Sequence, residues 1–418
     1  MNIGTRIRYY RLLRKISPEE LTEGITSVSF LSSIENNEQT PSIEMLSQLC
    51  DRLEIPFMTY PNEELTQIFG KWKYSLLQNN KEEATLIFKE LSSKISPRED
   101  IQLIFNYQIY LIRYFIIENQ FEKALELIEQ IKLFQFELPD ELNFSFQKFY
   151  GNYLYCTGNF IEASKLFNNA KNYLFSILEY LNEEKADLFY MYGLTLGRIN
   201  KNTLSIFYIE EALALFQQIY QMKRCTDCHM MLGLIYSRMQ DYDEAEKNYI
   251  IAKQLAASLK YYDLLNNIEN NLGLLKAKQD KSEEAIEHYL NSYSNHTKSD
   301  DQLQIIINII KEYYKIGFIH EVKIWLDQGF KLLESEEKHK DQYIELMFYQ
   351  YIVNGFPDGF EKFVLETAIP YYENIKQYHS IVLFSKKLGD YYQQRKKYQE
   401  AATSFAIANS AYEKILKL

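Results

Sequence analysis

The chain has 418 residues, of which only 14 are glycine and 8 are proline, about half the usual share of these turn-forming residues. This composition predicts an all-α protein and argues against β-sandwiches, barrels and doubly wound sheets. A single core stops growing near about 250–300 residues, so several domains or one extended array must share the length. The net charge is −11, yet the first fifteen residues hold five basic residues and no acid, which predicts that any anion is contacted near the N-terminus.

Residues 1–57 are predicted to form a small domain of short helices. Apolar residues at positions 3, 7, 10 and 13 give one helical stripe. Ser17 is a good N-cap, with Pro18 at the first helical position and Glu20 placed to complete a capping box. A further helix is expected to end at Asn36-Asn37, because asparagine tolerates the left-handed conformation. Residues 40–42, Thr-Pro-Ser, then cap a last helix.

This order of helices is similar to the lambda-repressor-like helix-turn-helix domain, whose second motif helix enters the major groove of DNA. The resemblance implies a double-stranded DNA operator as a partner. Residues 1–57 contain six basic and eight acidic residues, so the alternative is a head that has lost DNA binding and serves only packing. The positions that match the reading face are Ser27, Val28, Ser29, Ser32 and Ser33, and those expected at phosphates are Arg6, Arg11, Arg14 and Asn36.

Residues 58–65 are predicted to be a short, semi-rigid linker, because they follow Pro56, include Pro61 and contain the polar run Asn62-Glu63-Glu64. Residues 66–418 contain an internal repeat in which a small residue is followed by an aromatic residue four positions later and preceded by a glycine twelve positions earlier. Four copies are strong: Gly151 with Ala163 and Phe167, Gly233 with Ala245 and Tyr249, Gly273 with Ala285 and Tyr289, and Gly389 with Ala401 and Phe405.

Weaker copies fit the same frame, which gives nine helical hairpins. Their small-residue positions, here called anchors, are residues 84, 124, 163, 205, 245, 285, 322, 360 and 401. The pattern resembles the tetratricopeptide repeat, which implies a right-handed superhelix whose concave groove is lined by the first helix of each hairpin. An asparagine side chain in such a groove can bind both the N–H and the C=O groups of an extended peptide. The expected peptide contacts are Asn267, Asn270, Asn308, Arg198, Arg238 and Tyr190, with the arginines placed for a carboxylate.

No catalytic motif, cofactor or metal site is predicted. Cys225, Cys228 and His229 match the letters of a c-type haem attachment site. They fall on one semi-buried stripe of a predicted helix, and no export signal precedes them, so core packing is the preferred interpretation. The start of the chain has no apolar signal segment, and no apolar stretch is long enough to span a membrane, which predicts a cytoplasmic protein.

A helix-turn-helix head on a tetratricopeptide array resembles the peptide-pheromone-responsive regulators of Gram-positive bacteria, the Rap, Rgg, NprR, PlcR and PrgX group, and most closely the NprR branch. The resemblance implies a quorum-sensing transcriptional regulator, not an enzyme. Such a regulator binds a short imported peptide and changes the geometry of a homo-oligomer, dimer or tetramer, and with it DNA binding by the head. The alternative is a Rap-like protein that binds a response regulator of a phosphorelay and inhibits phosphotransfer or promotes dephosphorylation.

Overall fold

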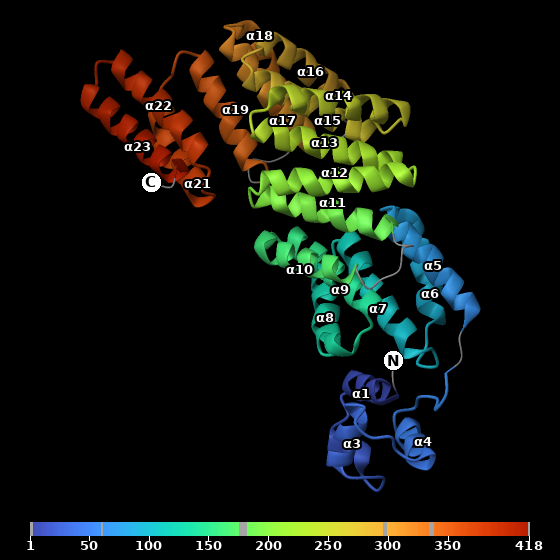
Figure 1. The fold of residues 1–418 in the computed structure, drawn as a ribbon. Helices are drawn as coiled ribbons and strands as arrows, with labels where there is room; N and C mark the ends of the chain where they lie inside the picture. Colours follow the sequence, from blue (N-terminus) through green and yellow to red (C-terminus); the bar gives the residue numbers. More distant parts are fainter. Residues whose placement is uncertain (1–2, 60–61, 175–181, 296–298, 334–337, 417–418) are drawn as a thin grey trace. The chain divides into compact units, whose positions relative to one another are not determined.

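The structure, a computed structural model, describes residues 3–59, 62–174, 182–295, 299–333 and 338–416 (Figure 1). Every regular element within these ranges is a helix, which confirms the predicted all-α class. The chain divides into two compact units, Met1–Ile235 and Tyr236–Leu418. The division falls inside helix α13, and each unit is described below by itself.

Four short helices form the head, and their caps follow the sequence. Their bounds are α1 Ile3–Leu13, α2 Pro18–Thr22, α3 Val28–Glu35 and α4 Ile43–Arg52. The predicted capping box is present, since Ser17 Oγ accepts from the Glu20 backbone N–H at 3.1 Å and Glu20 accepts from the Ser17 N–H at 2.8 Å. After α3 the chain turns at Asn37, whose φ of 60° is left-handed, so an asparagine at this helix end serves the predicted purpose.

Nine helix pairs follow the head in the described residues. In the first unit they are α5 Glu63–Leu77 with α6 Lys81–Lys94, α7 Ile101–Ile117 with α8 Phe121–Lys132, α9 Asp140–Cys156 with α10 Phe160–Tyr173, and α11 Asn182–Arg198 with α12 Asn202–Gln218. A 3₁₀ turn, η1 Gln135–Glu137, joins α8 to α9. The pair α13 Met222–Arg238 with α14 Tyr242–Ser258 spans the unit boundary.

The second unit continues the series to the last described helix. Its pairs are α15 Tyr262–Lys278 with α16 Ser282–Asn295, α17 Ser299–Lys315 with α18 Ile319–Leu332, α19 Lys340–Val353 with α20 Phe360–Phe363 and its continuation, and α22 Tyr378–Gln394 with α23 Tyr398–Leu416. That continuation is a π-helical turn, Val364–Ala368, followed by α21 Ile369–Asn374. Pro370, the second residue of α21, lacks a backbone N–H, which accounts for the irregular turn at this point.

The turn inside each hairpin repeats with the predicted period. In all nine pairs the residue five positions before the anchor has a positive φ, between 51° and 84°. These residues are Asn79, Asn119, Gly158, Asn200, Gln240, Asp280, Gly317, Gly355 and Lys396. Because one left-handed residue ends the first helix each time, the hairpins share one construction despite their different sequences.

The anchors and glycines pack the two helices of a pair closely. Every anchor is buried, and the most exposed, Ala401, reaches only 4%. A Cβ placed on Gly151 would lie 2.7 Å from the Phe167 ring, and one on Gly273 would lie 2.5 Å from Tyr289. Since real carbon atoms do not approach so closely, only glycine lets the aromatic side chain of the second helix sit against the first.

One continuous apolar core joins the head to the first repeats. It runs from Ile7 and Leu31 of the head through Trp72 and Phe105 to Phe149. The head therefore belongs to the same compact unit as the first repeats. Helix α5 begins at Glu63, inside the predicted linker of residues 58–65, and residues 60 and 61 lie outside the described ranges.

Candidate DNA-binding head and peptide-binding groove

The predicted reading face lies on α3 and at its N-terminus. Its side chains are exposed at Ser27, Val28, Ser29 and Ser32 and half-buried at Ser33. Ser27 is also the N-cap of α3, because its Oγ accepts a hydrogen bond from the Phe30 N–H at 3.2 Å. A base contact by Ser27 would use the remaining capacity of that hydroxyl. The face is accessible, small and uncharged.

A shallow concavity beside this face is acidic. Glu19, Glu20 and Glu23 line it together with Thr26 and the first residues of α3. Carboxylates at this place oppose the approach of phosphates, whose neutralisation supplies most of the non-specific affinity of DNA-binding proteins. The attraction must come from basic side chains elsewhere on the head.

Arg6, the first residue expected at a phosphate, is buried instead. Its side chain is 4% exposed. The guanidinium donates from Nη1 to the Pro56 carbonyl at 2.7 Å and from Nη2 to the Pro97 carbonyl at 3.0 Å. Arg6 thus fastens the head to the repeats, and the sequence prediction of a phosphate contact does not fit this arrangement. The reason is that an arginine fork satisfies two backbone carbonyls as readily as a phosphate.

Two further arginines of the predicted phosphate set are paired with carboxylates of the head. Arg11 makes two hydrogen bonds to Glu35, at 2.6 and 2.7 Å, and both side chains are about nine-tenths buried. Arg14 lies 2.6 Å from the exposed carboxylate of Glu54. Asn36 is exposed at the end of α3. Of these three residues, Asn36 and the half-exposed Arg14 are the better placed to meet DNA.

The predicted groove residues of the second unit come together on two neighbouring first helices. Asn308 of α17 is 7% exposed, and its Nδ2 donates to Oδ1 of the half-buried Asn270 on α15 at 3.4 Å. This distance is long for an N–H···O bond. Asn267 lies on the same helix as Asn270 and is exposed. Two amides joined by such a weak hydrogen bond can each bond to a peptide backbone instead, with little net change in free energy.

Two lysines extend this polar surface along the first helices. Lys311 of α17 lies 2.9 Å from Glu345 of α19. Lys278 at the end of α15 donates to Ser237 Oγ at 3.1 Å, and burial lowers the pKa of this lysine. The first helices of the second unit therefore carry neutral amides flanked by the Lys311–Glu345 ion pair and by Lys278.

The remaining predicted contacts are placed less distinctively. Arg198 is exposed at the end of α11, with its guanidinium 5.8 Å from the centre of the Phe160 ring. Tyr190 is half-buried, and the Arg224 guanidinium lies 4.7 Å from its ring centre. Arg238 is exposed at the end of α13. The predicted clamping of a carboxylate by Arg198 and Arg238 stays a prediction.

A buried ionic cluster on the inner helices of the first unit was missed by sequence reasoning. Lys148 of α9 is fully buried and bonds to Glu184 and, at 3.2 Å, to Asp187, both on α11. Arg224 of α13 donates to the other oxygen of Asp187 at 3.0 Å, and the Tyr110 hydroxyl donates to Glu184. The sequence did hold a signal, because Lys148 precedes Gly151 by three residues, as Asn270 precedes Gly273.

Two aspartates at matching places in successive repeats have opposite pKa shifts. Burial alone would raise the pKa of Asp187, but Lys148, Arg224 and Arg113 lower it to about 2. Burial raises the pKa of Asp227 to about 6, and Arg224 opposes this only in part. Asp187 is thus held ionised by its partners, whereas Asp227 is a half-buried acid whose proton is retained to a higher pH.

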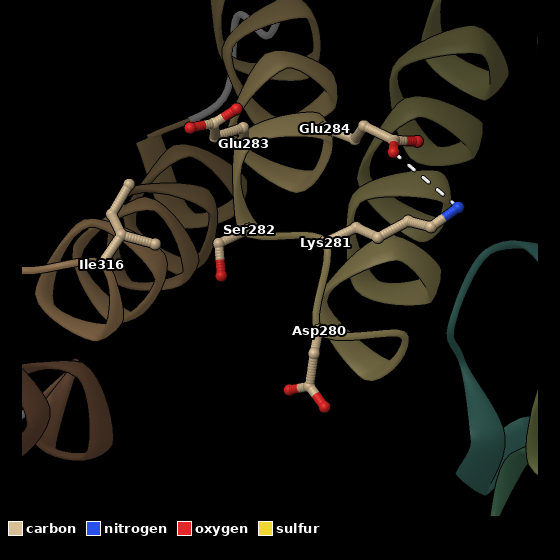
Figure 2. Close-up of a pocket in the computed structure, with 6 residues that line it drawn as sticks. All are labelled: Asp280, Lys281, Ser282, Glu283, Glu284 and Ile316. Atoms are coloured by element: carbon tan, nitrogen blue, oxygen red, sulfur yellow. Dashed lines mark ion pairs between the residues drawn. The ribbon is translucent and has the colours of Figure 1, made fainter.

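A small cavity of about 310 Å³ opens where α15 turns into α16, next to the end of α17 (Figure 2). Figure 2 shows its lining, in which Asp280, Glu283 and Glu284 outnumber Lys281. The Ser282 hydroxyl donates to Glu312 at 2.6 Å. None of the predicted peptide contacts lines this cavity, and its acidic rim is unsuited to a carboxylate.

The Cys-x-x-Cys-His segment is part of helix α13. Cys225 is 1% exposed and Cys228 is fully buried, so both thiols pack in the core as expected. Among the described residues no cluster of three or more histidine, cysteine or acidic side chains has the arrangement of a metal site. Within the same residues no helix combines the length and the apolar character needed to cross a bilayer.

These features define a class of protein, an all-helical chain with a helix-turn-helix head followed by tetratricopeptide-like repeats. The Helix-turn-helix family matches residues 7–58, and the Tetratricopeptide repeat family matches residues 226–303. The chain is 28% identical over 397 residues to the transcriptional activator NprA of Geobacillus stearothermophilus, covering 93% of this chain and 98% of that protein. It is 23% identical to the regulatory protein RapD of Bacillus subtilis, over 81% of this chain and 96% of RapD.

Solved structures share the fold. The apo form of the quorum sensor NprR from B. thuringiensis superposes with a TM-score of 0.73 at 17% identity, covering 84% of this chain and 99% of that one. NprR in complex with its cognate peptide NprX superposes with a TM-score of 0.57 at 17% identity, covering 85% of this chain and 99% of that one. The predicted resemblance to the helix-turn-helix and tetratricopeptide regulators of the NprR and Rap group is confirmed.

Proposed function

We propose that this protein is a cytoplasmic transcriptional regulator switched by a short signalling peptide. The observation that carries the proposal is the match to the transcriptional activator NprA, which runs through both the head and the repeats. The accessible face of α3 supports the assignment of the head to DNA. The amide pair Asn270–Asn308 supports a peptide site on the inner surface of the repeats, because such amides match the unpaired backbone groups of an extended chain.

The test is a gel shift with the promoter that flanks this protein's own gene. The full chain is titrated at low and high salt, alone and with synthetic peptides taken from short reading frames directly downstream. We expect a salt-sensitive complex whose affinity changes with one of the peptides. Absence of a complex at low salt under every condition would contradict the transcriptional role.

The last described helix supports a homo-oligomer. Tyr398, Phe405 and Tyr412 recur every seven positions on α23 and form one stripe, with Leu416 one turn further. Phe405 also packs beside Gly389, so the two tyrosines and Leu416 supply most of the exposed apolar surface. An exposed apolar stripe of this kind fits the surface of a second copy. We expect Tyr412→Lys to shift the sedimentation coefficient toward the monomer. Lys414→Glu, a charge change on the same helix outside the stripe, should leave the coefficient unchanged.

A Rap-like role is the second candidate, and the engaged arginines of the head favour it. Arg6 and Arg11 are tied to protein groups rather than presented to solvent, and RapD matches most of the chain. In that role the protein would bind a response regulator of a phosphorelay. Co-purification with a purified phosphorylated response regulator, together with no promoter complex, would favour this candidate over the first.

A further inference from the structure

One carboxylate of the repeats holds the first helix of the head. Glu137 lies on the 3₁₀ turn η1, and both of its oxygens are used. Oε2 accepts from the Thr5 hydroxyl at 2.6 Å, and Oε1 accepts from Nη1 of Arg8 at 2.6 Å. The Arg8 guanidinium also lies 5.2 Å from the centre of the Phe134 ring. These bonds connect residues more than 120 positions apart in the sequence.

Aromatic contacts and one further hydrogen bond, all made by Tyr9, surround the bonds to Glu137. The ring of Tyr9 meets Phe105 and Phe134 edge-on, with ring centres 5.1 and 5.9 Å apart. Gln108 of α7 donates to the Tyr9 hydroxyl at 2.6 Å. Helix α1 is therefore docked on α7 and η1 through one face, and Glu137 supplies the ionic part of the contact.

We propose that Glu137 is a latch that competes with DNA phosphate for Arg8 and Thr5, so that the docked arrangement is the low-affinity state of the head. The inference rests on the proposed DNA-binding function. A carboxylate and a phosphate both accept hydrogen bonds from guanidinium and hydroxyl groups. While Glu137 holds both donors, a phosphate must displace it, and the negative charge of Glu137 stays beside the basic face of α1.

The position of the latch ties it to the repeats. Phe134 and Leu138, on either side of η1, are 3% and 5% exposed, whereas Phe136 between them is fully exposed. Buried residues on both sides fix η1 to the packing of α8 and α9. A change in how these two helices pack would move Glu137 away from Arg8, which links the arrangement of the repeats to the affinity of the head.

The experiment compares full-length wild type, Glu137→Gln and a matched control, Glu129→Gln. Glu129 lies on α8, is 59% exposed and pairs with the neighbouring Lys132, so its replacement removes the same charge without touching the head. The probe is a fluorescent duplex of the promoter that flanks the gene, titrated at several salt concentrations. We expect Glu137→Gln to bind about tenfold more tightly and with a steeper salt dependence, because one more basic group meets phosphate. Glu129→Gln should match wild type.

Two more variants keep the test decisive. Arg8→Gln added to Glu137→Gln should abolish the gain, since the freed donor is then missing. Glu137→Asp keeps the charge but shortens the side chain by one methylene, which weakens its bonds to Arg8 and Thr5 and leaves both donors in place. It should raise the affinity by about threefold, and it carries the test if Glu137→Gln fails to fold. If Glu137→Gln or Glu137→Asp binds the duplex as wild type does, the latch is overturned and the DNA-binding role stands. If wild type and all variants fail to bind at low salt, the proposed function itself is overturned.

Discussion

The inner helices of the two compact units use the same repeat positions for opposite purposes. In the first unit these positions carry Lys148 and Asp187, which are buried and bonded to each other at 3.2 Å. In the second unit they carry Asn270, which meets Asn308 through a long amide contact of 3.4 Å. In the first unit the helices are joined by a buried ion pair. In the second unit they are joined by a neutral hydrogen bond that a ligand can replace.

The two contacts differ in the free energy that is lost when each is broken. Opening the first leaves buried charges without partners, which costs about 3–5 kcal/mol when one partner is removed. Opening the second exchanges one neutral hydrogen bond for another, with a net change near zero. At the same repeat positions, side-chain chemistry therefore distinguishes a structural face in the first unit from a face with an exchangeable hydrogen bond in the second, which supports the peptide site that we propose for the second unit.

The largest expected effect comes from breaking the ionic cluster. Lys148→Met leaves Glu184 and Asp187 buried with fewer partners, so the free energy of unfolding should fall by about 3–5 kcal/mol. A urea titration followed by circular dichroism measures the change. Lys165→Met on α10 is the control, because Lys165 pairs with Glu162 at the surface and should cost less than about 1 kcal/mol. Equal midpoints for the two variants would show that the cluster does not stabilise the unit.

A smaller effect is expected from Asp227, the aspartate of the first unit whose pKa is raised. The pKa of Asp227 is raised to about 6 by burial, so its contribution to stability is complete below about pH 4 and is lost as the pH rises through about 6. Asp227→Asn should remove this loss and raise the free energy of unfolding at pH 7 by about 2 kcal/mol. Urea titrations between pH 4 and 7 test it, with the exposed Asp358→Asn as control. Parallel pH profiles for wild type and Asp227→Asn would contradict the shift.

The repeat frame was predictable because the residues that define each hairpin lie close together in the sequence. The anchors, the glycines and the left-handed turn five residues earlier recur about every 40 residues, so one strong copy such as Gly273 with Tyr289 identifies the others. The capping box at Ser17 was predictable for the same reason, since its two partners lie three residues apart.

The engagement of the arginines could not be predicted, because their partners are distant in the sequence. Arg11 finds Glu35 and Arg14 finds Glu54, 24 and 40 residues away, and Arg8 finds Glu137 after 129 residues. From the sequence alone, a run of basic residues is interpreted as a surface that binds anions. The fold brings distant carboxylates against these basic side chains. The burial of Lys148 could not be predicted because lysine is normally exposed, although Lys148 occupies the same repeat position as the groove residue Asn270.

The smallest change in stability, with a specific change in binding, is expected from the amide pair of the second unit. Asn270→Ala removes one side chain that can bond an extended peptide, and the loss of such a bond should weaken peptide binding by about tenfold. The urea midpoint should stay close to that of wild type, because Asn270 is half-buried and its bond to Asn308 is long. Asn271→Ala is the control, since it lies on the same helix about 100° further round. A pool of synthetic short peptides passed over each immobilised variant, with retained members identified by mass spectrometry, measures the difference. Equal retention by Asn270→Ala and Asn271→Ala would remove Asn270 from the site, whereas a selective loss would show that the exchangeable inner face belongs to the second unit.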